Sequence, residues 1–345
     1  MFSAKSTAKS AVKAQNERSP AVYAHEQSWL RRLVAVPELG ITVAVVLAFL
    51  LFALLDRSML TPGTLIRILT QTAYIGFAAY GMNYLMIAGE IDLSTGAMAG
   101  LGAAVTAVLV VDRGWAEWQA IAAALLVAVA GGLLNSLIVL KIGMPSFFAT
   151  LGTSFVITGC TVVLLQGRWV YVAGKMPLLA GLGGPSPLWG IPWNFMLYLA
   201  LILLGDLLIR RSRLGPILSA TGDNRRAADV SGINTALVKT LCFVFIGICS
   251  AFAGMLVMNV GTAADPEIGT GWQLWIIAIA VIGGCSFNGG VGSIIGGMLG
   301  TILIMIIRIG LAAANVQTNA QGVVVGAILV AAAILDVLRR RVQRY

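Results

Sequence analysis

Apolar stretches of membrane-spanning length recur along almost the whole chain, and they constrain its fold more than any other feature. Of the 345 residues, 59% are hydrophobic and 11% are charged, and a mean hydropathy of +0.92 exceeds that of soluble globular domains. A transmembrane helix needs about 20 apolar residues. Suitable stretches cover residues 38–55, 71–89, 95–111, 118–140, 147–166, 194–210, 237–260, 271–284, 292–311 and 320–338. The sequence therefore predicts an all-α, polytopic membrane protein with about ten transmembrane helices. The number of transmembrane helices could differ by one or two from ten, because some stretches are short or interrupted by glycine.

The basic residues are distributed unevenly between the two sides of such a bundle. With ten crossings, 17 of the 23 Lys and Arg residues fall on one side, and the positive-inside rule places that side in the cytoplasm. Both termini are then cytoplasmic. We expect a basic N-terminal tail (1–37), a transmembrane domain (38–338) with a cytoplasmic loop (211–236), and a basic C-terminal segment (339–345). The net charge of +9 follows from this topology, so a nucleic-acid partner is not expected.

Two carboxylates and a hydroxyl lie at a glycine-flanked break between the second and third apolar stretches. Glu90, Asp92 and Ser94 occur within residues 89–96. Ionisable groups are costly in lipid unless they face protein or water, and a glycine-flanked break can line a cavity. One interpretation is that these residues line or gate a translocation pathway. The other is that Asp92 or Ser94 caps the following helix, and the two roles are compatible. Asn83, in the preceding apolar stretch, is assigned to the same candidate pathway.

A second glycine-rich break covers residues 282–293. It opens a helix much as residues 89–96 do, which weakly indicates an internal duplication. A phosphate-binding loop would need a lysine at its end, and none is present, so tight backbone turning is favoured. Residues 144–153 predict a helix-turn-helix at the membrane face. The aromatic residues of loop 167–193 are typical either of an interfacial belt or of a docking surface for an external partner.

Four segments together resemble the permease subunits of ribose- and galactose-type ABC importers, a family that also transports other monosaccharides and autoinducer-2. They are Gly-x-Ile-Asp-Leu-Ser-x-Gly (89–96), Pro-x-Phe-x-Ala-Thr-Leu-Gly (145–152), Gly-x-Asn-x-x-Ala-Ala-x-x-Ser-Gly-Ile (222–233) and Gly-Gly-x-Ser-x-x-Gly-Gly-x-Gly (283–292). Their order and spacing extend over about 250 residues, whereas the tail before residue 38 is not covered. Glu90 departs from the family pattern, which usually has glycine there.

The resemblance implies a bacterial inner-membrane protein that forms half of a transport channel, as a homodimer or with a similar permease. A periplasmic sugar-binding protein would deliver the solute, and a cytoplasmic ATPase would drive transport. The sequence has no Walker-type Gly-x-x-x-x-Gly-Lys-Ser/Thr motif. We therefore expect no enzyme activity and no cofactor on this chain, with ATP and Mg²⁺ bound by the partner. The single histidine, His25, and the four cysteines have no metal-ligand spacing, so no metal site is expected either.

The central polar loop, residues 221–234, is the predicted contact with the ATPase. It can form a short helix across the membrane plane, capped by Asn224 or Asp223, with small residues that allow close approach to a groove. An ordinary basic loop is the alternative. The residues assigned to coupling are Gly222, Asp223, Asn224, Arg225, Ala227, Ala228, Ser231 and Gly232.

Two alternative functions remain open at this point. An ion-coupled secondary transporter would need a coupling-ion site, for which Glu90 and Asp92 are the candidates. Within the importer class, a permease for nucleosides or branched-chain amino acids shares the bundle and similar loops. The sequence does not name the solute, because a binding protein does most of the selecting.

Overall fold

The structure is a computed structural model that describes residues 37–186, 188, 190–317 and, further on, 322–324, 326–327, 330–331 and 334. In this part of the chain, regular structure is helical apart from two strands of two residues each, so the predicted all-α class is confirmed. In chain order the elements are α3 (Pro37–Leu55), η2 (Arg57–Leu60), α4 (Pro62–Ile87), α5 (Thr95–Val111), α6 (Glu117–Leu137), η3 (Ile138–Ile142), α7 (Ser146–Leu165), β1 (Val170–Tyr171), α8 (Pro177–Gly183), α9 (Trp193–Arg211), α10 (Leu214–Asp223), α11 (Arg225–Val230), α12 (Thr235–Gly261), β2 (Ala263–Ala264), α13 (Trp272–Ile282) and α14 (Ile294–Ala313).

The first nine predicted stretches each coincide with a helix, and the tenth, 320–338, is described only at isolated positions. Among the described residues, six helices are long and apolar enough to cross a membrane: α3, α6 together with η3, α7, α9, α12 and α14. Helices α5 and α13 are apolar but shorter. The chain is thus a multi-pass helical protein, and the count of about ten crossings stays a prediction. The tail 1–36 and the segment 339–345 lie outside the described residues.

Helix α4 is longer and more polar than its apolar stretch predicts. It begins at Pro62, where the Thr61 hydroxyl accepts a hydrogen bond from the amide of Thr64 and the proline occupies the first turn. From Thr72 to Ile87 almost every side chain is buried, including Thr72 and Asn83. Other helices rather than lipid surround this half, so its polar groups do not face hydrocarbon. Helix α4 is therefore a central element of the bundle.

Helix α12 is the second central element, and small residues bring it close to its neighbours. It packs on α4, α5 and α6. A methyl group added at Gly254 would lie 1.9 Å from the carbonyl oxygen of Ala99, and one at Gly102 would lie 2.7 Å from the Cβ of Ala251. Such backbone approach is how helices associate in lipid, where no hydrophobic force drives them together.

The outer helices present large apolar side chains to their surroundings. Leu54 of α3 is 86% exposed, Leu126 of α6 is 70% exposed and Val163 of α7 is 78% exposed. A water-soluble monomer rarely exposes contiguous apolar surface on this scale. These outer faces identify a multi-pass membrane protein.

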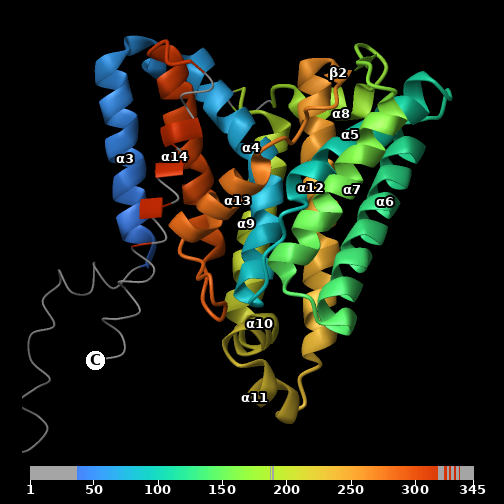
Figure 1. The fold of residues 1–345 in the computed structure, drawn as a ribbon. Coiled ribbons are helices and arrows are strands. Elements are labelled where there is room, and N and C mark those ends of the chain that lie inside the picture. The colour runs from blue at the N-terminus through green and yellow to red at the C-terminus, as the bar shows by residue number, and fades with distance from the viewer. Residues whose placement is uncertain are drawn as a thin grey trace, which may run out of the picture.

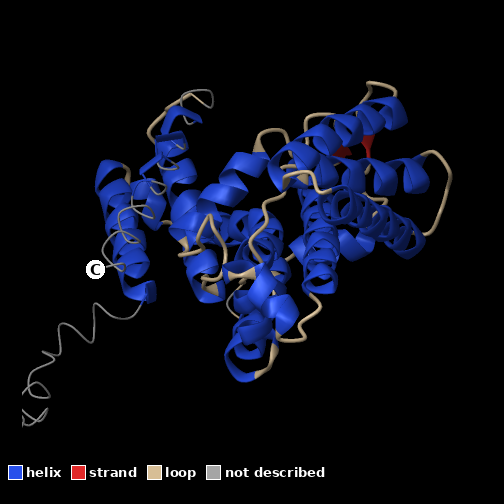
Figure 2. Ribbon diagram, turned by 60° about the horizontal axis from the view of Figure 1, so that its bottom comes forward, coloured by secondary structure: helices blue, strands red, loops and turns tan. Residues whose placement is uncertain are grey.

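The two ends of the bundle carry different elements (Figure 1). At one end, β1 pairs antiparallel with β2, and Glu117 accepts hydrogen bonds from the amides of Leu178 and Leu179 at the start of α8. The predicted loop 167–193 is therefore partly folded. At the other end α10 and α11 project beyond the bundle, and Figure 2 shows them with this end turned forward.

Candidate translocation and coupling site

The first predicted break is present between α4 and α5. The chain leaves α4 after Ile87, turns through Gly89 at φ +83°, and resumes helix at Thr95. Asp92 is 2% exposed, and its Oδ1 accepts hydrogen bonds from the amide and the hydroxyl of Ser94, each at 2.6 Å. Ser94 occupies the N-cap position of α5 without a side-chain capping bond. Asp92 therefore stabilises the turn before α5, but neither Asp92 nor Ser94 makes the side-chain capping bond to α5 that the capping interpretation expects.

Helices α6 and α7 complete a buried polar network around Asp92. Asn135 of α6 donates to Ser94 Oγ at 2.8 Å and to Asp92 Oδ2 at 3.2 Å. Thr153 of α7 donates to Asn135 Oδ1 at 2.6 Å, and Thr150 accepts from the amide of Leu93 at 2.9 Å. Asn135 was not among the predicted site residues, although a lone amide within an apolar stretch is a signal for an interhelical hydrogen bond.

Glu90 forms an ion pair with α12. Its Oε1 lies 2.6 Å from Lys239 Nζ, and the two side chains are 13% and 8% exposed. Lys239 is one of the 17 basic residues on the predicted cytoplasmic side, and its pairing with Glu90 was not predicted. The pair fixes the break between α4 and α5 to the beginning of α12, at the end of the bundle that carries α10.

Glycines from three distant segments meet at one point, which we call the glycine junction: Gly89, Gly222, Gly289 and Gly290. A methyl group at Gly222 would lie 2.0 Å from the carbonyl oxygen of Ile87 and 2.6 Å from the amide nitrogen of Gly290. Gly290 in turn donates its amide hydrogen to Ile87 at 2.9 Å. The end of α10 thus rests directly on the backbone of both breaks. Tight turning at the second break is consistent with this contact.

Asn83 lies apart from Asp92 and Ser94. It is 1% exposed and faces α14, where a methyl group at Gly297 would lie 1.9 Å from Asn83 Nδ2. Cys285 Sγ lies 3.5 Å from its Oδ1, and Nδ2 has no hydrogen-bond partner among the described residues. The four candidate pathway residues therefore form a group of three, at the break, and one separate position.

The central loop folds as two short helices, α10 and α11, that meet at Asn224. As predicted, Asn224 caps α11, since its Oδ1 accepts from the amide of Ala227 at 3.1 Å. Ser231 closes the helix by donating to Ala227, and Gly232 turns the chain at φ +85°. Arg225 lies 3.9 Å from Asp229.

The two alanines of α11 face in different directions. Ala228 is 3% exposed and packs within the chain, whereas Ala227 is exposed. Among the exposed residues of this loop, Asp223, Arg225, Arg226 and Asp229 are charged, and Val230 is 90% exposed. Val230 is a large apolar side chain left open at the surface of α11, and it was not among the predicted coupling residues.

A cavity of about 240 Å³ lies beside the break, between α5, α7 and the segment before α13. Leu93 and Ala97 connect it to the break. Its polar lining comes from Ser154, Thr158, Thr161, Thr270 and Gln273. At about 30 Å³ per molecule in the liquid, this volume corresponds to several waters. None of these hydroxyls was a candidate, because Ser and Thr within apolar stretches are common.

The apolar outer faces, the two breaks and the projecting helix pair define a membrane transport component. A family model described as "Branched-chain amino acid transport system / permease component" matches residues 64–333, and the chain belongs to this family.

Similar proteins include three sugar permeases. The ribose import permease protein RbsC of Bacillus subtilis (strain 168) is 32% identical over 300 residues, covering 87% of this chain and 91% of the relative. The D-allose transport system permease protein AlsC of Escherichia coli (strain K12) is 33% identical over 281 residues, covering 80% and 84%. The galactose/methyl galactoside import permease protein MglC of the same strain is 29% identical over 327 residues, covering 89% and 96%. No solved structure matches. The resemblance to ribose- and galactose-type permeases is confirmed.

Proposed function

We propose that this chain is the membrane permease of an ATP-driven importer for a monosaccharide or a similar small polar solute. Support for the solute class comes from the relatives, whose names specify ribose, allose and galactose. One observation carries the mechanism: the end of α10 rests on both helix breaks at the glycine junction. A displacement of α10 and α11 by a soluble partner is thereby passed to the backbone of the membrane bundle.

The proposed partners follow from the position of each surface. A cytoplasmic ATPase, which holds ATP and Mg²⁺, binds the exposed face of α10 and α11. A soluble binding protein delivers the solute at the opposite end of the bundle, and a second permease copy or a similar permease completes the channel. The proposed location is a bacterial inner membrane, with α10, α11 and both termini in the cytoplasm.

The proposed solute path runs along the cavity beside the first break. Hydroxyl and amide groups of Ser154, Thr158 and Gln273 offer hydrogen bonds to a polar solute, while Leu93 and Ala97 lead to the break. In this role Glu90, Asp92 and Ser94 set the position of the break next to the path. A coupling-ion site at Glu90 and Asp92 finds no support, because Lys239 pairs with the first carboxylate and three donor groups bind the second.

The experiment is an uptake assay in cells that lack their own monosaccharide importers. The chain is expressed with the ATPase and the binding protein of the same operon, and labelled ribose, allose, galactose and leucine are supplied. We expect sugar uptake that persists when the proton gradient is collapsed and stops when the Walker lysine of the ATPase is replaced. Uptake by the permease alone under a proton gradient would establish a secondary transporter. Uptake of leucine without sugar would support the amino-acid alternative that the family description names.

A further inference from the structure

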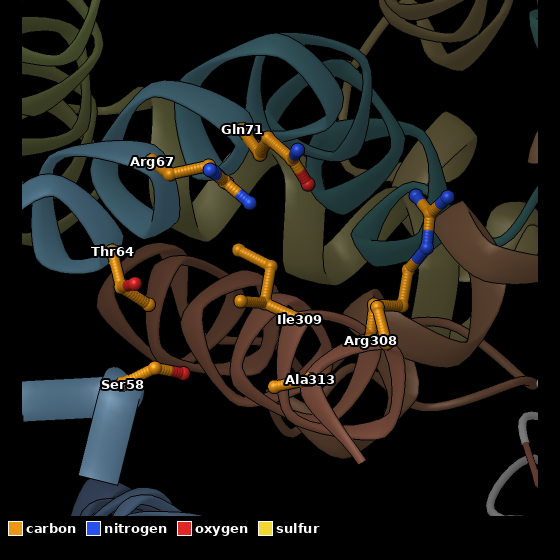
Figure 3. Close-up of a pocket in the computed structure, with 8 residues that line it drawn as sticks. Ser58, Thr64, Arg67, Gln71, Arg308, Ile309 and Ala313 are labelled. Atoms are coloured by element: carbon orange, nitrogen blue, oxygen red, sulfur yellow. The ribbon is translucent and has the colours of Figure 1, made fainter. Parts of the chain in front are cut away.

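A polar pocket of about 470 Å³ opens at the end of the bundle opposite α10 and α11. It lies between η2, the first turns of α4 and the last turns of α14. Its polar lining consists of Ser58, Thr64, Arg67, Gln71 and Arg308. Figure 3 shows Arg67 and Gln71 extending from α4 above Ile309, and Arg308 extending from α14 at the right of the view. The pocket is separate from the break, from the cavity beside α7 and from the glycine junction.

The pocket carries two positive charges that no carboxylate neutralises within the described part of the chain. Ion pairs there involve other arginines and one lysine, but neither Arg67 nor Arg308. Asp56 lies nearby in the sequence, yet its Oδ1 accepts from the amide of Ser58 at 2.8 Å and forms the cap of η2. Two guanidinium groups that share one pocket repel each other, so an anion between them would be stabilised.

Arg308 is held in place by an aromatic side chain. Its guanidinium lies 5.0 Å from the centre of the Trp275 ring, which is a cation–π geometry. Arg67 is exposed at the rim, on a helix face that also presents the Gln71 amide. A planar guanidinium presents paired N–H groups that match the two oxygens of a carboxylate. The pocket thus has one fixed and one accessible donor group for an anionic side chain.

We propose that this pocket is a docking site for an acidic side chain of the soluble solute-binding protein. The inference rests on the proposed function, which places this end of the bundle outside the cytoplasm. A carboxylate on the partner would enter between Arg67 and Arg308 and receive further hydrogen bonds from Ser58, Thr64 or Gln71. Such pairing between opposite charges sets the orientation of a docked protein and speeds its association.

The test measures binding of the operon's solute-binding protein to the permease–ATPase complex in nanodiscs. R67E reverses the charge at the exposed rim, R67K keeps the charge, and R57E makes the same reversal at an exposed arginine on η2 that does not line the pocket. We expect R67E to weaken affinity at least about tenfold at low salt, R67K to stay close to the wild type, and R57E to have a smaller effect. Charge reversal of one partner carboxylate should restore binding to R67E.

Three outcomes would contradict the proposed docking site. Equal losses in R67E and R57E would indicate general attraction by a basic surface. Unchanged affinity in R67E would exclude this contact. Thermal stabilisation by inorganic phosphate that R67E removes, with protein binding unchanged, would identify a small-anion site instead. Wild-type uptake in the same complexes distinguishes these results from a failure of the proposed function, since an importer with an unrelated docking surface would still transport sugar.

Discussion

Gly222 has no space for a side chain, because backbone rather than flexible side-chain atoms surround its α-carbon. The carbonyl of Ile87 and the amide of Gly290 both lie against the position of a side chain at Gly222, and these two groups also bond to each other. Neither can move without shifting a helix break. A single residue thus links the loop that projects from the bundle to both irregular segments within it.

We predict that Gly222→Ala separates ATPase binding from transport. The added methyl group would lie 2.0 Å from the Ile87 oxygen, so α10 must move away from the breaks while its exposed face is unchanged. Co-purification with the ATPase should persist. Sugar uptake should fall at least about tenfold if the coupling free energy that depends on this contact exceeds about 1.4 kcal/mol. Gly40→Ala is the matched control, since Gly40 lies in helix α3 with nothing within 4 Å of its added carbon. Normal uptake in Gly222→Ala would refute transmission through this contact.

Asp92 is expected to contribute to stability more than a helix cap alone. Asp92→Ala would leave two buried donors without their acceptor, the Ser94 amide and the Ser94 hydroxyl, and it would remove one of the two hydrogen bonds that the Asn135 amide donates. An unsatisfied buried group costs roughly 1–3 kcal/mol, compared with about 1 kcal/mol for a lost cap. Thermal unfolding in detergent should show a lower Tm for Asp92→Ala than for Asn224→Ala, which removes an exposed cap. An unchanged Tm in Asp92→Ala would argue against the structural role.

At the scale of elements, α10 and α11 have an inner face that packs on the bundle and an outer face that is exposed. Gly222 and Ala228 face the chain, whereas Arg225, Arg226 and Val230 are available to a partner. Replacing Ala228 by a large residue would therefore disturb the packing of the chain itself. A test of partner binding must change the outer face instead.

We predict that Val230→Asp abolishes binding of the ATPase and leaves the bundle folded. Val230 is 90% exposed, so its replacement removes no internal packing, and a charge there would be desolvated in an apolar groove of the partner. The ATPase should be lost on co-purification while Tm is unchanged. The matched control is Tyr171→Asp, which places the same charge at a 65% exposed side chain of β1, at the end of the bundle opposite α11. Retention of the ATPase by Val230→Asp would place the contact elsewhere.

Local patterns in the sequence predict single elements well, but not the pairs that form between them. Apolar length predicts α3, α7 and α12, and the glycines at 89 and 283–292 predict the breaks, because these features depend on a few adjacent residues. The Asn224 cap is predicted for the same reason. The partner of Glu90, by contrast, is Lys239, 149 residues away. Such a pairing depends on how each helix is rotated and which helix lies beside it, and one sequence does not specify either.

For the whole molecule, the structure separates two ends, and the basic residues predict which one is cytoplasmic. Arg210 and Arg211 end α9 close to α10, and Lys141 lies in η3 at the same end. Arg168, at the opposite end, is paired with Asp112. The excess of basic residues around α10 therefore favours retention of this end in the cytoplasm during insertion.

We predict that reporters inserted at Gly174 and at Gly232 lie on opposite sides of the membrane, with Gly232 cytoplasmic. Both positions tolerate insertion, because each glycine has nothing within 4 Å of an added carbon and lies in a turn outside the helices. A phosphatase reporter, active only outside the cytoplasm, should be active at Gly174 and inactive at Gly232. A fusion after Tyr345 should match Gly232 if the chain crosses an even number of times. Activity at Gly232 would invert the topology and remove α10 and α11 from contact with any cytoplasmic ATPase. Activity at Tyr345 alone would preserve the coupling end and change the number of crossings after α14.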